Sequence, residues 1–105
     1  MDKFMLSETS VVKLNKNVAV RFEHNFCSGT VFLINVETEK IWQGNKESLL
    51  LINELRANKS LKSIKEIYTK IIQEYFEYDV SQVIKALNVL LTNLYENGFL
   101  DVIKF

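Results

Sequence analysis

The order of structural patterns along the chain is the feature that most constrains its fold. Residues 29–36 are rich in β-branched and aromatic side chains, and the short run 40–43 follows after three polar residues. Such composition favours strands, and three polar residues are enough for a hairpin connection. Three amphipathic helical stretches come only after this hairpin. The chain therefore predicts an α+β fold in which the sheet precedes the helices.

The strand patterns predict a three-stranded antiparallel sheet. Residues 18–23 alternate in polarity, which is typical of a half-buried strand, and residues 30–36 are apolar on both faces, as in a central strand. Residues 40–43 are the last and shortest strand, which we expect at an edge of the sheet. Residues 11–14 have the pattern of a short extended segment, and residues 101–105 either cap the sheet or trail off.

Capping residues delimit three helices in the second half of the chain. Side-chain oxygens of Asn, Ser and Asp accept hydrogen bonds from the first free N–H groups of a helix, and Ser63 and Glu66 have the spacing of a capping box. The expected helices run from Asn45 to about residues 57–58, from Ser60 or Ser63 through Tyr75, and from Asp79 or Ser81 to Asn97-Gly98. Together they predict one winged-helix-like domain (βββααα) over residues 11–105, with a flexible arm over residues 1–10.

Composition narrows the possible partners and location. The 105 residues suffice for one domain, and the 13 basic and 13 acidic residues give no net charge that would attract nucleic acid or an anionic membrane. The single cysteine, Cys27, has no internal disulfide partner. The apolar run 49–52 is far shorter than the roughly 20 residues that span a bilayer. We therefore expect a cytoplasmic protein with no membrane partner.

Catalytic and cofactor patterns are weak. His24, the only histidine, lies three residues from Cys27, but two side chains this close in one loop usually point apart, so we do not expect a nucleophile and base pair. One cysteine and one histidine cannot supply the four ligands of a zinc site. Glu37 and Glu39 are best interpreted as a solvated turn. We expect no enzyme, metal or cofactor, and keep a thiol enzyme that uses Cys27 as a remote alternative.

A winged-helix-like layout also suggests DNA binding. A recognition helix needs basic side chains for phosphates and base edges. The predicted third helix offers only Lys85, against Asp79 and Glu96. A DNA-binding regulator or adaptor is therefore the alternative, not the preferred function, and we expect no nucleic-acid partner.

Two apolar features exceed what a simple core requires. Trp42 lies on the short edge strand, and the third helix is apolar beyond one stripe: Ala86 and Leu90 widen the stripe, and Val89 lies nearly opposite. One interpretation is a wide core contact. The other is an apolar groove between this helix and the edge strand, which would accept an extended peptide as a further strand.

These segments resemble the PqqD-like family, the small peptide chaperone of pyrroloquinoline quinone biosynthesis and prototype of the RiPP recognition element (RRE). RiPPs are ribosomally made and post-translationally modified peptides. The resemblance covers about residues 11–103 and is carried by residues 31–42, Asn45, Ile52, Leu55, residues 60–67, Tyr75, Val83, Leu87, Leu91, Leu94 and residues 98–100.

The resemblance implies a binding protein for the leader region of a precursor peptide. Such domains add the leader as a strand beside their third strand and third helix, and leave the rest of the peptide to a separate RiPP-modifying enzyme, for example a radical SAM maturase. Carried onto this chain, the leader-binding residues would be Lys40, Ile41, Trp42, Gln43, Val83, Ala86 and Leu90. Ala86 stands where an acidic residue is frequent in the family, which indicates a different leader.

Overall fold

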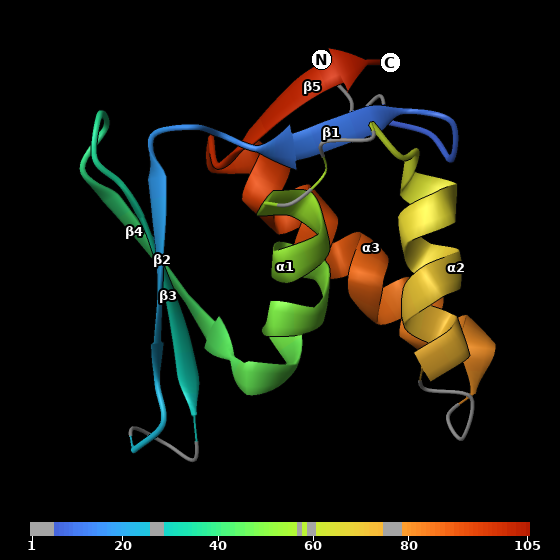
Figure 1. Ribbon diagram of the computed structural model, residues 1–105, viewed down its shortest axis with the longest axis horizontal. Coiled ribbons are helices and arrows are strands. Elements are labelled where there is room, and N and C mark those ends of the chain that lie inside the picture. Colours follow the sequence, from blue (N-terminus) through green and yellow to red (C-terminus); the bar gives the residue numbers. More distant parts are fainter. Residues whose placement is uncertain (1–5, 26–28, 57, 59–60, 75–78) are drawn as a thin grey trace.

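A computed structural model describes residues 6–25, 29–56, 58, 61–74 and 79–105 (Figure 1). The elements are β1 (Val11–Leu14), β2 (Val18–Glu23), β3 (Thr30–Asn35), β4 (Lys40–Asn45), the 3₁₀ turn η1 (Lys46–Ser48), α1 (Leu49–Arg56), α2 (Ile64–Glu74), α3 (Val80–Glu96) and β5 (Leu100–Lys104). The predicted α+β class is confirmed. So is the three-stranded antiparallel sheet, which has the order β2-β3-β4 with β3 at its centre.

The helices lie on one side of this sheet. Figure 1 shows α1 between the sheet and α2, with α3 crossing behind α1, while β1 and β5 run across one end of the helices. The core fills the space between these layers. Its buried side chains include Val31 and Leu33 from the sheet, Leu51, Ile52 and Leu55 from α1, Ile64, Ile67 and Ile71 from α2, and Leu87, Leu91 and Leu94 from α3.

The chain end corrects the predicted order βββααα. Residues 100–104 do not trail off: β5 pairs antiparallel with β1 in a two-stranded sheet that is separate from the sheet β2-β3-β4. Val12 lies opposite Val102, and the Asn15 amide donates to the Phe99 carbonyl at 2.9 Å. Pairing between strands so far apart in sequence leaves no local signature, which is why the sequence indicated a short extended segment at residues 11–14 and no strand at the chain end.

The helix starts agree with the prediction in part. The capping box is confirmed: the Ser63 amide donates to Glu66 Oε1 at 2.8 Å, and the Glu66 amide donates to Ser63 Oγ at 3.2 Å. Asn45 is not the cap of α1, because β4 continues through it and η1 intervenes. Its side chain accepts from Ser48 Oγ at 3.2 Å and caps no backbone amide.

Some predicted features fall outside the described residues. These are residues 1–5 of the predicted arm, Cys27, Ser60 and Tyr75. Within the described part of the arm, Ser10 is fully buried, and its hydroxyl donates to the Phe105 carbonyl at 2.7 Å.

Candidate functional site

The strand β4 lies at an edge of the sheet, as expected. The direction of its backbone groups follows from its neighbours. Val36 N–H donates to the Asn17 carbonyl at 3.0 Å, toward β2. Because successive residues of a strand direct their backbone groups to opposite sides, Ile34 also bonds toward β2, whereas Leu33 bonds toward β4.

The register then identifies the outward groups of β4. Leu33 is paired with Trp42, so the backbone of Trp42 points toward β3. Its neighbours Ile41 and Gln43 therefore direct N–H and C=O away from the sheet. Among the described residues no strand pairs along this side of β4. The sequence predicted Lys40 to Gln43 as one docking strand; its register leaves Ile41 and Gln43 as the residues that present free backbone groups.

The Trp42 side chain connects β4 to α3. Its indole N–H donates to Asn93 Oδ1 at 3.0 Å, and Asn97 Nδ2 donates to the same oxygen at 3.2 Å. The indole also lies against Gly44: a Cβ there would come within 2.7 Å of Trp42 Cζ3. The missing side chain at Gly44 thus makes room for the ring. Trp42 is half-buried and packs against the core, while Ile41 on the opposite face is 67% exposed.

The three predicted α3 residues lie on the same side of the helix as Asn93 but nearer its N-terminus, Val83 by roughly 15 Å along the axis. At 3.6 residues per turn, Ala86, Leu90 and Val83 lie roughly 20°, 60° and 80° around the helix from Asn93. Val83 and Leu90 are half-buried against the core, and Ala86 is exposed. We call this combination the β4–α3 surface: the backbone of Ile41 and Gln43, the Trp42 and Asn93 side chains, and Val83, Ala86 and Leu90.

Asn93 itself was missed from the sequence. It is seven residues, two helical turns, beyond Ala86, so it lies on the predicted wall and periodicity could have included it. However, a pattern of apolar side chains at helical spacing does not include a polar residue such as Asn93. Lys40, also predicted, is exposed at the start of β4, and its backbone bonds toward β3 because it is paired with Asn35.

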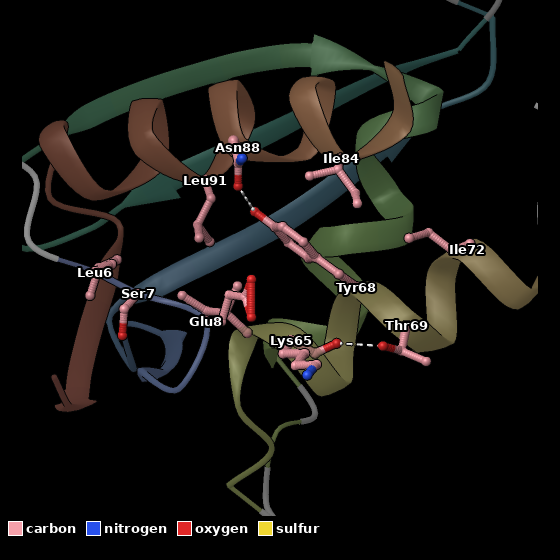
Figure 2. Close-up of a pocket in the computed structure, with 11 residues that line it drawn as sticks. Leu6, Ser7, Glu8, Lys65, Tyr68, Thr69, Ile72, Ile84, Asn88 and Leu91 are labelled. Atoms are coloured by element: carbon pink, nitrogen blue, oxygen red, sulfur yellow. Dashed lines mark hydrogen bonds between the residues drawn. The ribbon is translucent and has the colours of Figure 1, made fainter. Parts of the chain in front are cut away.

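The other flank of α3 borders a cavity that the sequence did not predict. It has a volume of about 410 Å³ and lies between residues 6–8, α2 and α3 (Figure 2). Its lining residues are Leu6, Ser7, Glu8, Ile64, Lys65, Tyr68, Thr69, Ile72, Ile84, Asn88 and Leu91. The Tyr68 hydroxyl donates to Asn88 Oδ1 at 2.9 Å, and burial raises the pKa of this hydroxyl well above its ordinary value.

Comparison of the chain with protein-family models, with curated proteins and with solved structures found no match. The PqqD-like character of the chain therefore stays a resemblance.

The described residues show few other side-chain arrangements that suggest catalysis or metal binding. His24, Glu37 and Glu39 are exposed, and the described part of the chain holds no group of three His, Cys, Asp or Glu side chains placed to ligate a metal. The thiol of Cys27 lies outside the described residues. None of the helices in the described ranges combines the length and the apolar character that a bilayer crossing requires.

Proposed function

We propose that this protein binds the leader region of a ribosomally made precursor peptide and presents the peptide to a separate modifying enzyme. The observation that carries the proposal is the orientation of β4, whose Ile41 and Gln43 backbone groups point away from the sheet beside an apolar helix flank. An extended peptide satisfies such groups by adding a strand. The resemblance to the RRE domains supports a leader peptide as that strand.

The β4–α3 surface separates affinity from selectivity. Backbone hydrogen bonds to Ile41 and Gln43 contribute affinity for an extended peptide of any sequence. Selectivity comes from every second peptide side chain, which faces α3 and contacts Trp42, Ala86 and Leu90. The Asn93 bond holds the indole in one position before a peptide arrives. A wall already in place reduces the ordering cost of binding.

The proposed role needs no catalytic group or cofactor in this chain. A cytoplasmic binding protein that holds both a precursor and a modifying enzyme raises the effective concentration of one at the other. A radical SAM maturase is one enzyme class that fits the resemblance. The genes next to this one are the first place to look for a short precursor and its maturase.

A titration with synthetic leader peptide tests the proposal directly. We expect backbone amide shifts at Ile41 and Gln43, and a change in the fluorescence of Trp42, the one tryptophan of the chain. Unchanged shifts along β4 at high peptide concentration, while duplex DNA causes salt-sensitive shifts on α3, would instead support the DNA-binding alternative.

A matched pair of proline variants makes the test specific. Gln43→Pro removes an N–H that points away from the sheet, and proline is tolerated at such edge positions. Val20→Pro does the same at the opposite edge, since Val20 pairs with Leu33, whose backbone bonds toward β4, so the N–H of Val20 points outward from β2. We expect Gln43→Pro to weaken leader binding about tenfold and Val20→Pro to leave it unchanged. Equal losses in both variants would contradict strand addition at β4.

A further inference from the structure

One face of the sheet β2-β3-β4 is covered by none of the elements that the structure describes. All three helices lie on the side of the sheet where Val31 and Leu33 are buried (Figure 1). Because side chains alternate along a strand, Ile34 lies on the opposite face, which we call the outer face. Its cross-strand partners, Ala19 on β2 and Ile41 on β4, share that face. Together they form an apolar row across all three strands.

This row and its surroundings are exposed. Ile41 is 67% and Val36 64% exposed, Ala19 is also exposed, and Ile34 is half-buried between its neighbours. Val36 continues the outer side of β3, because its N–H bonds to the Asn17 carbonyl at 3.0 Å and extends the β2–β3 ladder by one pair. An antiparallel sheet with one solvated face normally carries polar residues on that face. An apolar row there indicates a face that a partner covers.

Two opposite charges border the apolar row on the β2 side. Arg21 follows Ala19 by two residues, so it is on the outer face, where its side chain is 71% exposed and paired with Glu23. Asn17 precedes Ala19 by two residues, and its amide donates to Glu37 Oε1 at 3.2 Å, which holds this exposed carboxylate beside the face. Arg21 and Asn17 are each roughly 7 Å from Ala19 along the strand. The basic and the acidic group therefore lie at similar distances on either side of the row.

We propose that the outer face is the interface of a homodimer, in which a second copy of this chain stacks the same face on the first. A twofold axis that crosses the strands at the row of Ile34 places apolar row on apolar row. It also places Arg21 of each copy against Asn17 and Glu37 of the other, so two ion pairs form. An axis midway between this row and that of Arg21 would instead set Glu23 against Glu37, two like charges. Charge complementarity thus favours a second copy in one register.

The size of the face predicts a weak dimer. Strands of six residues in a three-stranded sheet offer a face of roughly 14 by 20 Å, whereas a standard interface buries about 800 Å² on each partner. We therefore expect a Kd of roughly 10 to 100 μM. Stacked sheets lie about 10 Å apart, so the free edges of both β4 strands open on the same side of the dimer. The dimer goes beyond the leader-binding function and stands without it.

Sedimentation velocity of the full chain, at concentrations below and above the expected Kd, measures the association. We expect amide shifts at Ala19, Ile34 and Ile41 that follow the dimer fraction in NMR spectra. Ala19→Lys, at an exposed position, brings two ammonium groups together at the twofold axis and should abolish the dimer. Val89→Lys makes the same change in charge at a 66% exposed position of α3 and should leave the Kd unchanged.

A charge swap tests the register. Arg21→Glu and Glu37→Arg each replace attraction by repulsion at two symmetric contacts and should raise the Kd about tenfold. The double variant restores both pairs in the opposite sense and should return the Kd to within about threefold of wild type. The proposal fails if the protein stays monomeric at every concentration, if Ala19→Lys dimerises like wild type, or if the double variant is no tighter than the single ones. Pairing of two β4 edges, the competing dimer, would give these last two results.

Discussion

The indole N–H of Trp42 donates to Asn93 Oδ1 at 3.0 Å and so ties the edge strand β4 to the C-terminal half of α3. The bond spans 51 residues of sequence. It fixes the ring beside the outward backbone groups of Ile41 and Gln43. Leader binding and the position of this ring are therefore expected to depend on each other.

Replacement of Trp42 tests this dependence. We expect Trp42→Ala to weaken leader binding about tenfold or more, because a half-buried aromatic anchor is lost, and Trp42→Phe to recover part of the affinity but not the bond to Asn93. Calorimetric titration measures both. Val36→Ala, at an exposed hairpin position, is the control and should bind normally. If a folded Trp42→Ala protein bound leader with wild-type affinity, Trp42 would serve only the core.

Gly44→Ala should displace the indole of Trp42 while its hydrogen-bond partner Asn93 stays unmutated. The added methyl would lie 2.7 Å from Trp42 Cζ3 and 2.8 Å from Ser48 Oγ, closer than atoms pack. We expect the free energy of unfolding to fall by about 1 to 3 kcal/mol and the Trp42 emission to shift. Gly98→Ala is the matched control, because it meets no atom within 4 Å but has a φ of +82°. It should cost about 1 kcal/mol through backbone strain alone and leave the emission as it is.

Asn58 should be important for stability although it is polar. It is buried, and its side chain donates to the Val12 carbonyl at 2.9 Å and to the Lys62 carbonyl at 3.1 Å, and accepts from the Lys62 amide at 2.7 Å. We expect Asn58→Ala to lower the free energy of unfolding by about 2 to 4 kcal/mol, because buried backbone groups lose their partners. Urea unfolding measures this. The exposed Asn53 provides the comparison: Asn53→Ala should change stability by less than about 0.5 kcal/mol.

The stability that Asp79, the N-cap of α3, contributes to the fold should depend on pH. The hydroxyl and amide of Ser81 both donate to Asp79 Oδ1 and lower the pKa of this carboxyl from 3.8. A carboxyl whose pKa is lower in the folded state stabilises the fold fully above its unfolded pKa, and this contribution disappears as the pH falls through the folded pKa. The Tm of wild type should exceed that of Asp79→Ala at pH 7, and the difference should shrink below about pH 4.

The variant Asp79→Asn serves as the control for this cap. Asparagine also accepts the Ser81 bonds but does not titrate. Its Tm advantage over Asp79→Ala should therefore persist at low pH. An advantage of wild type that stayed constant down to pH 2 would show that the Asp79 charge plays no part.

Local patterns predicted those parts of the fold that depend on near neighbours in sequence. The hairpin of β3 and β4 follows from β-branched residues on both sides of a short polar turn. The capping box of Ser63 and Glu66 spans only three residues, and both of its bonds are present. Gly98 has the positive φ expected of a residue that ends a helix. Local rules misplaced the start of α1, because the pairing of Thr30 with Asn45 extends β4 past Gly44.

The sequence by itself thus determined the α+β class, the antiparallel sheet and the faces of the helices, since hydrophobic period and capping act within a few residues. Only the tertiary structure decided that β5 pairs with β1, that Asn93 receives the Trp42 bond, and that a cavity opens beside Tyr68. Each of these joins segments far apart in the chain. Such contacts depend on how whole elements pack, and a polar partner or an empty space leaves no periodic trace along the chain.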